Sequence, residues 1–108
     1  MNINQYDVYW TDLNPAKGSE INKVRPCVVI SPPEMNAYLR TVIVAPVTSK
    51  GREGYPTRVY MSVSDVYGWV VLDQIRAIDK SRLCNKIGSL DENAVCAIKS
   101  VIKEMLVD

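Results

Sequence analysis

Five short segments rich in valine, isoleucine, tyrosine and threonine most strongly constrain what this chain can fold into. The segments are residues 6–11, 27–30, 42–47, 57–63 and 69–75. Apolar residues alternate in the first segment and dominate the other four. Both patterns are typical of β-strands, and residues that break or turn a chain, mainly proline, glycine and asparagine, separate them. Short strands at this spacing predict a small, strongly bent sheet or barrel, and therefore a mainly β fold of the α+β class.

Two further segments show helical patterns. Residues 33–39 predict a short helix that begins with a proline. Near the C-terminus, Ser89 and Glu92 have the spacing of a capping box, with Ser89 as the N-cap. The residues after it follow one helical face, namely Ala94, Val95, Ile98, Val101, Ile102 and Met105. We expect this C-terminal amphipathic helix to cover the barrel and to be available to a partner subunit.

The composition fits one domain, residues 1–108, because 47% of the 108 residues are hydrophobic and 23% are charged. No apolar stretch is long enough to cross a membrane and the N-terminus lacks the pattern of a secretory signal, so we expect a cytoplasmic protein with no membrane partner. The chain has no histidine, and its cysteines lie too far apart in sequence for the usual zinc sets. We interpret Cys27, Cys84 and Cys96 as small buried hydrophobic residues, and expect neither a metal nor another cofactor.

The charges are unevenly distributed, although the formal net charge is only +1. Residues 40–86 contain eight lysines or arginines against four acidic residues. A modest, salt-sensitive anion site explains this excess, and so does scattered charge that keeps a surface soluble. The charge pattern leaves both interpretations open.

Arg25 stands between a polar turn and a wholly apolar strand, and Pro26 restricts it to extended conformations. An arginine at this place either pairs with a carboxylate, for which Glu20 is the nearest candidate, or holds a phosphate through its planar guanidinium. Its position alone does not decide between the two roles.

Thr48, Ser49 and Lys50 close the next apolar strand, in which Pro46 implies a bulge or an edge. Hydroxyls at strand ends often bond to the local backbone, and this is the alternative to a role in binding. If this strand pairs with the one after Arg25, their polar ends meet. An anion such as a phosphate would then find an arginine, a lysine and two hydroxyls together.

Two acidic residues further along are expected to have partners. Asp73 follows four apolar residues, where an unpaired carboxylate is costly, so we expect it to be paired, most simply with an arginine. Spacing does not show whether that pair is structural or catalytic. Residues 79–82 predict an Asx turn with a structural role.

The chemistry open to this chain is limited by its lack of histidine and of a glycine-rich phosphate loop. Catalytic triads and acid–base pairs that use histidine are therefore excluded. Any phosphate chemistry must rest on arginine, hydroxyls and carboxylates. This fits attack by a ribose 2′-hydroxyl, because the substrate then brings its own nucleophile.

These residues together resemble the MazF/PemK toxins of bacterial toxin–antitoxin pairs. The resemblance is carried by residues 7–10, 12–15, 17–20, 25–30, 44–49, 55–57, 72–76 and 79–83. It implies a small SH3-like barrel of the CcdB/PemK type that forms a homodimer. It also implies metal-independent cleavage of single-stranded RNA at short sequences, leaving 2′,3′-cyclic phosphate and 5′-hydroxyl ends. An acidic MazE-like antitoxin is the implied partner, with DNA binding through the toxin–antitoxin complex.

The resemblance also implies roles for individual residues. The essential arginine and threonine of the family fall on Arg25 and Thr48, which are thus the expected catalytic residues. The expected RNA contacts are Ser19, Glu20, Ser49, Lys50, Asp73, Gln74 and Arg76. Some members have a histidine in place of Ser19 and an arginine in place of Val71, so a mechanism that uses those two groups cannot operate here.

Two alternatives remain at this point. Gyrase poisons of the CcdB type share the fold class without cutting RNA, and do not need Arg25 and Thr48 together at one anion site. A non-catalytic SH3-like module that binds peptides would need aromatic residues clustered in one groove. This chain has no phenylalanine, and its tryptophans and tyrosines are dispersed in the sequence.

Overall fold

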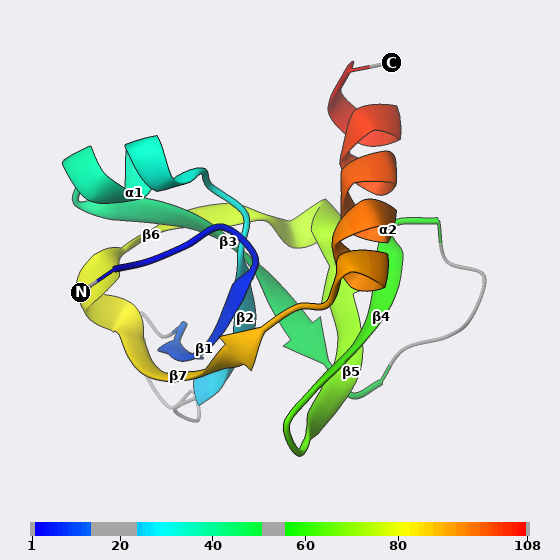
Figure 1. Ribbon diagram of the computed structural model, residues 1–108, viewed down its shortest axis with the longest axis horizontal. Helices are drawn as coiled ribbons and strands as arrows, with labels where there is room; N and C mark the ends of the chain where they lie inside the picture. The colour runs from blue at the N-terminus through cyan, green and yellow to red at the C-terminus, as the bar shows by residue number, and fades with distance from the viewer. Residues whose placement is uncertain (1, 14–23, 51–55, 108) are drawn as a thin grey trace, which may run out of the picture.

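One strongly curved antiparallel sheet forms the body of the protein in a computed structural model, which describes residues 2–13, 24–50 and 56–107 (Figure 1). Its strands are β1 (Asp7–Asp12), β2 (Val24–Val29), β3 (Thr41–Thr48), β4 (Arg58–Val63), β5 (Val66–Val71), β6 (Arg76–Asp79) and β7 (Leu83–Ser89). They lie in the order β4-β5-β3-β2-β1-β7, and β6 also pairs with β3. The predicted mainly β, barrel-like fold is confirmed.

Strand β3 explains how the sheet curls, because it changes partner along one edge. Residues 41–44 pair with β6, whereas Val47 and Thr48 pair with β5. Pro46 lies where the partner changes, and a proline has no backbone N–H to donate to the ladder. The sequence predicted a bulge or an edge at Pro46, and this is wrong, because β3 is a central strand in which Pro46 stays paired with Cys27 of β2 while the partner changes on the other side.

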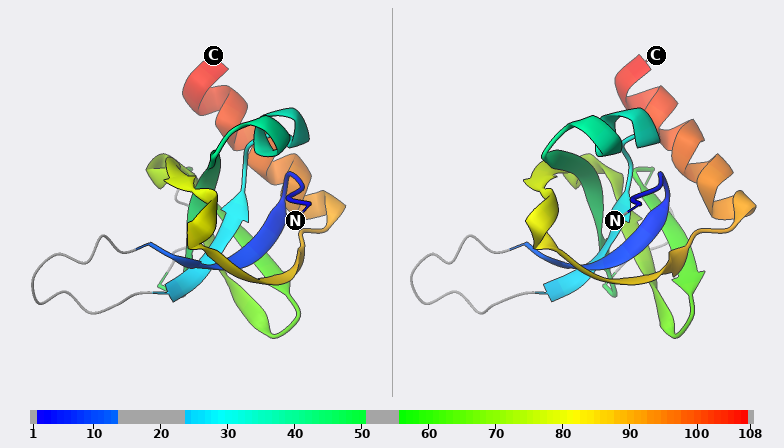
Figure 2. Two further views of the ribbon diagram at one scale, coloured as in Figure 1. Left: turned by 90° about the vertical axis from the view of Figure 1, so that its left-hand side faces the viewer. Right: turned by 60° about the vertical axis from the view of Figure 1, so that its left-hand side comes forward.

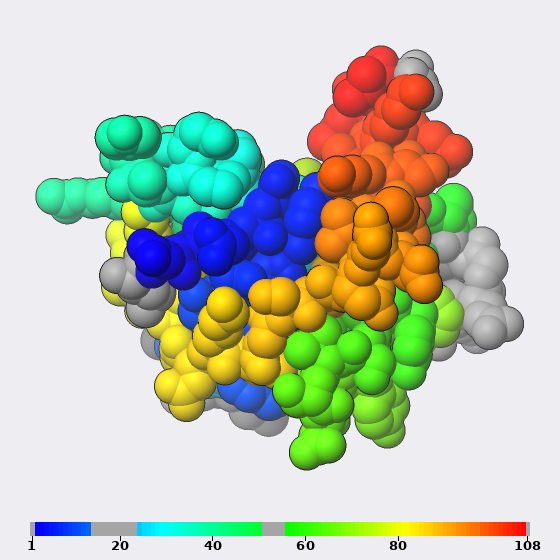
Figure 3. All heavy atoms as spheres, in the orientation of Figure 1, coloured from blue at the N-terminus to red at the C-terminus, as the bar shows by residue number. Residues whose placement is uncertain are grey.

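Two helices pack on the sheet on different sides (Figures 1 and 3). Helix α1 (Pro33–Tyr38) begins with a proline, as predicted, and lies over β3 and β6. Helix α2 (Glu92–Ile102) stands beside β4 and continues into a π-helical turn, η3 (Lys103–Val107). Ile98 of α2 is fully buried, and Val101 packs with its apolar neighbours against the core. The predicted amphipathic face is confirmed, and no helix among the described residues is long and apolar enough to span a membrane.

Alternate residues of the central strands point to opposite faces of the sheet and form two core clusters. The first cluster lies under α2 and contains Val8, Val28, Ala45, Val47, Val59, Met61, Val70, Leu72 and Ile98. The second contains Ile3, Tyr9, Cys27, Val29, Val42, Val44, Ile78 and Leu83. The two clusters hold β1, β2 and β3 in place from both faces, and these are the strands that carry the site described below.

The prediction of a strand over residues 69–75 is wrong for its second half. Strand β5 ends at Val71, and the 3-10 turn η1 (Leu72–Gln74) follows. The backbone N–H of Leu72 donates to the carbonyl of Thr57, and the Leu72 side chain is fully buried. The turn buries Leu72 while Gln74 stays exposed, whereas a continued strand would place both on the same face.

Strands β6 and β7 lie in segments for which the sequence predicted no strand. Strand β7 has little apolar alternation, and most of its residues are exposed. It pairs with β1 through two irregularities in register, which interrupt the side-chain alternation that identifies a strand. The predicted Asx turn after β6 is confirmed, because Oδ1 of Asp79 accepts a hydrogen bond from the backbone N–H of Ser81 at 2.8 Å.

The N-cap of α2 is Asp91 and not Ser89, so the predicted capping box is also wrong. The Asp91 carboxylate accepts a hydrogen bond from the backbone N–H of Ala94 at 2.8 Å. The hydroxyl of Ser89 instead donates to the buried carboxylate of Asp7 at 2.7 Å. Because β7 extends as far as Ser89, the helix starts later than the sequence pattern indicated.

Asp91→Ala is expected to lower the free energy of unfolding by about 1 kcal/mol, because the first turn of α2 loses its side-chain cap. Urea denaturation followed by circular dichroism measures this. Glu92→Ala is the matched control, since Glu92 lies in the same turn without serving as the cap. Equal stability of Asp91→Ala and the unsubstituted protein would contradict this assignment of the cap.

Candidate functional site

A groove of about 700 Å³ opens where the start of β2, the end of β3 and the β4–β5 hairpin come together. These segments lie at the lower side of the molecule in Figure 1, and both views in Figure 2 place the start of β2 and the hairpin at that side. The groove is lined by Trp10, Val24, Arg25, Pro26, Val47, Thr48, Ser49, Lys50, Asp65, Val66 and Tyr67. Four of the residues that the sequence proposed, Arg25, Thr48, Ser49 and Lys50, therefore share one cavity.

Arg25 lies in β2 opposite Thr11 of β1, and its side chain is half-buried. The extended conformation expected before Pro26 is confirmed, since both residues belong to the strand. Within the described residues Arg25 forms no ion pair or hydrogen bond through its side chain. Glu20, the carboxylate proposed as its partner, lies outside the described residues, as does Ser19.

Thr48 ends β3 and lines the groove. Its Oγ1 accepts a hydrogen bond from the backbone N–H of Lys50 at 3.2 Å, so the local role proposed for this hydroxyl does occur. This bond uses Oγ1 as an acceptor and leaves its O–H available as a donor. Thr48 can therefore donate to an anion in the groove without giving up its backbone contact.

The neighbouring strand β5 fixes the backbone of Thr48. Trp69 lies opposite Thr48 in the ladder and packs edge-to-face on Tyr60, with 5.5 Å between the ring centroids. Next to Trp69, a Cβ atom on Gly68 would lie only 2.6 Å from the carbonyl oxygen of Thr48. A glycine is thus required for this close approach, which fixes the end of β3 against the hairpin.

Asp73, Gln74 and Arg76 do not line this groove. The Asp73 carboxylate accepts hydrogen bonds from Thr57 at 2.9 Å and from Arg58 at 3.4 Å, so its predicted pairing with an arginine is confirmed. Desolvation alone would raise the pKa of Asp73, but its hydrogen bonds outweigh it and lower the pKa below its ordinary value. Gln74 is exposed on η1, and Arg76 starts β6 opposite Val44. Their role as RNA contacts stays a prediction.

The prediction that all three cysteines are buried is wrong for two of them. Cys27 is fully buried in the second core cluster, and burial raises the pKa of its thiol to about 11. Cys84 on β7 and Cys96 on α2 are exposed, because they lie on the solvent faces of their elements. In the described part of the chain, no three histidine, cysteine, aspartate or glutamate side chains lie together where they would hold a metal ion.

A second groove, of about 600 Å³, lies between β4 and α2 and includes Arg58, Tyr60 and Asn93 in its lining. None of the proposed catalytic or RNA-binding residues lies in it. The groove with Arg25 and Thr48 is therefore the candidate functional site.

Comparison with known protein families identifies this arrangement. Residues 4–106 match the model of the PemK-like, MazF-like toxins of type II toxin–antitoxin systems. The chain belongs to this family. The resemblance inferred from the sequence is confirmed. The match favours a MazF/PemK-like toxin over the gyrase-poison and peptide-binding alternatives.

Relatives of this MazF/PemK-family chain are named endoribonucleases. The chain is 37% identical over 101 residues to Endoribonuclease MazF of Staphylococcus saprophyticus, covering 89% of this chain and 84% of the relative. It is 36% identical over 109 residues to Endoribonuclease EndoA of Bacillus subtilis, covering 95% and 93% respectively.

Solved structures of MazF proteins have the same fold. The structure of a MazE–MazF complex from Deinococcus radiodurans matches this chain with a TM-score of 0.85 and 25% identity. The match covers 98% of this chain and 96% of the matched chain. A mycobacterial endoribonuclease in complex with its cognate antitoxin has a TM-score of 0.82 at 24% identity, over 96% and 94% of the chains.

The groove of this MazF/PemK-family chain also contains residues that sequence reasoning missed, above all Trp10, Asp65 and Tyr67. The aromatic residues are dispersed in the sequence, but the fold brings Trp10 and Tyr67 into one groove. A two-residue turn at residues 64–65, between two apolar runs, was the signal that would have placed Asp65 and Tyr67 near the tip of a hairpin.

Proposed function

We propose that this chain is the endoribonuclease toxin of a toxin–antitoxin pair and cuts single-stranded RNA at short sequences. The observation that carries the proposal is that Arg25 and Thr48, far apart in sequence, line one groove. The names of the relatives support the activity. The presence of Lys50 in the same groove supports an anionic substrate.

The ribose 2′-hydroxyl is the proposed nucleophile. Its oxygen attacks the adjacent phosphorus and loses its proton, while the bond from phosphorus to the 5′-oxygen breaks and that oxygen gains a proton. The products are a 2′,3′-cyclic phosphate and a 5′-hydroxyl. The Arg25 guanidinium neutralises the charge that develops on the phosphate, and the Thr48 hydroxyl donates to a non-bridging oxygen.

The other proposed contacts extend the RNA path beyond the reacting phosphate. Ser49 and Lys50 lie beside Thr48 in the groove. The remaining proposed RNA contacts are Ser19, Glu20, Asp73, Gln74 and Arg76. Asp73 and Gln74 on η1 and Arg76 at the start of β6 would meet nucleotides further along the strand.

The proposed setting is a cytoplasmic homodimer in which residues 1–108 form one toxin domain. The proposed regulator is an acidic MazE-like antitoxin, and DNA binding would occur through the complex of the two. An acidic, partly apolar segment would be attracted to the Arg25 and Lys50 charges in the groove. The solved complexes of relatives with MazE or a cognate antitoxin support this partner.

Cleavage of a long mixed-sequence RNA by the purified protein is expected to persist in excess EDTA, because Arg25 and Thr48 supply the charge stabilisation that a metal would otherwise provide. Gel electrophoresis with and without the chelator measures this. A magnesium-dependent nuclease treated in parallel is the control. Activity that vanishes with EDTA and returns with magnesium would contradict the proposed chemistry, and an RNA that stays intact in every condition would contradict the proposed function.

A further inference from the structure

The β4–β5 hairpin contributes two groove residues to which the proposed reaction gives no role. Asp65 lies in the turn, Tyr67 lies in β5, and both line the groove that contains Arg25 and Thr48. The Tyr67 ring is prominent, since 66% of this residue is exposed. Both side chains are therefore available to a ligand that occupies the groove.

The hairpin tip contacts β7, and these contacts position its side chains. Val63 and Val66 are the last paired residues, so only Ser64 and Asp65 form the turn. The Ser64 hydroxyl donates to the carbonyl of Ile87 in β7 at 3.4 Å, and its backbone has a positive φ of 53°. The absence of a side chain at Gly88 allows Val63 to pack against β7, since a Cβ there would lie 2.5 Å from Val63 Cγ1.

The Asp65 carboxylate is an unexpected group in a groove that holds cations. Within the described residues Asp65 has no ion pair or side-chain hydrogen bond, although Arg25 and Lys50 line the same groove. A carboxylate repels phosphates, so it does not contribute to binding the RNA backbone. Its favourable contacts with RNA are with hydrogen-bond donors, and these lie on the edges of the bases.

The geometry of a carboxylate selects among the four bases. Its two oxygens accept two hydrogen bonds side by side. On its Watson–Crick edge, guanine presents two adjacent donors, N1–H and the N2 amino group. Adenine and cytosine present one amino group next to an acceptor nitrogen, and uracil presents one N–H between two carbonyls. A guanine in single-stranded RNA is therefore the base that an aspartate binds best.

The Tyr67 ring supplies the second part of a base-binding site. Exposed aromatic rings in nucleic-acid grooves stack on bases. Tyr67 follows Asp65 by two residues and lines the same groove, so one base in the groove can contact both side chains.

We propose that Asp65 and Tyr67 form a recognition subsite for one guanine in the RNA substrate. Tyr67 stacks on the base, and Asp65 accepts hydrogen bonds from its N1–H and N2 amino group. The inference rests on the proposed endoribonuclease function and adds a specific base to it. It also places base recognition on the β4–β5 hairpin.

The first test compares cleavage sites in a long mixed-sequence RNA by sequencing the fragment ends. The unsubstituted protein is expected to prefer guanine at one fixed position relative to the cut. Asp65→Asn is expected to reduce that preference roughly tenfold or more, because a bidentate contact discriminates between bases by about 1–3 kcal/mol. Tyr67→Ala is expected to raise KM with little change in kcat, and Tyr67→Phe, which keeps the ring, is expected to behave as the unsubstituted protein.

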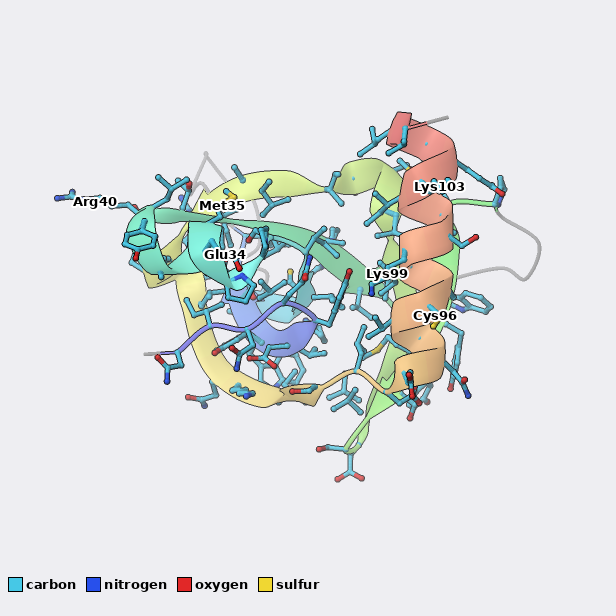
Figure 4. The ribbon with its side chains drawn as sticks, turned by 45° about the horizontal axis from the view of Figure 1, so that its top comes forward. Glu34, Met35, Arg40, Cys96, Lys99 and Lys103 are labelled. Carbon is cyan, nitrogen blue, oxygen red and sulfur yellow. The ribbon has the colours of Figure 1, made fainter. Side chains whose placement is uncertain are left out.

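Matched controls come from α1, on the upper face of the molecule (Figure 4). Glu34→Gln neutralises a carboxylate there, and Tyr38→Ala removes a tyrosine that is 87% exposed. Neither is expected to alter the cleavage sites or KM. Thermal melting of each variant shows that it is folded.

A binding measurement keeps the inference testable apart from catalysis. Fluorescence polarisation compares the affinity of the protein for 2′-deoxy oligouridylate with and without one guanine. The guanine is expected to strengthen binding by roughly tenfold in the unsubstituted protein and not in Asp65→Asn. If no RNA is cut but guanine still strengthens binding to the unsubstituted protein and not to Asp65→Asn, the result contradicts the proposed endoribonuclease function and supports the guanine subsite.

Several results would overturn the subsite. One is that the unsubstituted protein shows no preference for guanine in cleavage or in binding. Another is that Asp65→Asn keeps the same preference as the unsubstituted protein. A third is that Asp65→Asn and Tyr67→Ala weaken binding of an acidic antitoxin peptide while leaving the cleavage sites unchanged. In that case the hairpin belongs to a protein interface.

Discussion

Arg25→Ala is expected to abolish RNA cleavage, with a fall in kcat on the order of 10² to 10³ or more. Arg25 lies at the start of β2 in the groove, and in the proposed mechanism its guanidinium acts on charge that develops mainly in the transition state. The protein is expected to melt cooperatively after the substitution, because the Arg25 side chain has no ion pair or hydrogen bond with the described residues. Single-turnover kinetics and a thermal melt measure the two effects.

Arg25→Lys and Arg40→Ala make this test specific. Arg25→Lys keeps the charge but loses the planar fork that binds two phosphate oxygens at once, so it is expected to restore little activity. Arg40→Ala removes an exposed arginine between α1 and β3, where its side chain points into solvent (Figure 4), and is expected to leave cleavage unchanged. Near-normal activity of Arg25→Ala would place the anion site elsewhere, and unfolding of that variant would assign Arg25 a structural role.

The sequence predicted the strands that build the site because their patterns are local. β-Branched residues, turn signals and the Arg25-Pro26 pair each act over a few residues. The predictions that were wrong concern boundaries that depend on contacts between distant segments. The end of β5 at Val71 is set by the bond from Leu72 to Thr57, and the start of α2 is set by how far β7 pairs with β1.

The sequence predicted that the two proposed catalytic residues would meet in one groove, but it did not predict the whole lining of that groove. Arg25 and Thr48 were found because Arg25 begins one apolar strand and Thr48 ends another, and such ends meet where antiparallel strands pair. Asp65 and Tyr67 belong to a hairpin that folds back across the end of β3, and no local pattern specifies that position. Asp73 was correctly expected to be paired, but its partner comes from the adjacent strand β4, and the pair lies outside the groove lining.

An RNA oligonucleotide with a single 2′-deoxyribose on the 5′ side of the cleaved bond is expected to remain intact. If the 2′-hydroxyl is the nucleophile, this change removes the attacking atom and nothing else. The bases and the phosphate charges, which supply most of the affinity, are unchanged. The oligonucleotide is therefore expected to bind about as tightly as the all-RNA substrate and to inhibit its cleavage competitively. The matched control carries the deoxyribose one nucleotide further along and is expected to be cut normally.

Mass spectrometry of the all-RNA products completes this test of mechanism. Attack by the 2′-hydroxyl leaves a 2′,3′-cyclic phosphate, or the 3′-phosphate formed by its hydrolysis, on one fragment and a 5′-hydroxyl on the other. Attack by water from outside the substrate would instead permit a 5′-phosphate product and would not need the 2′-hydroxyl. Efficient cleavage of the singly deoxy oligonucleotide, or a 5′-phosphate on the product, would therefore show that Arg25 and Thr48 do not have the roles assigned to them. We expect the cyclic phosphate, because the substrate itself holds the 2′-hydroxyl beside the phosphorus, whereas a water molecule would have to be bound and oriented separately.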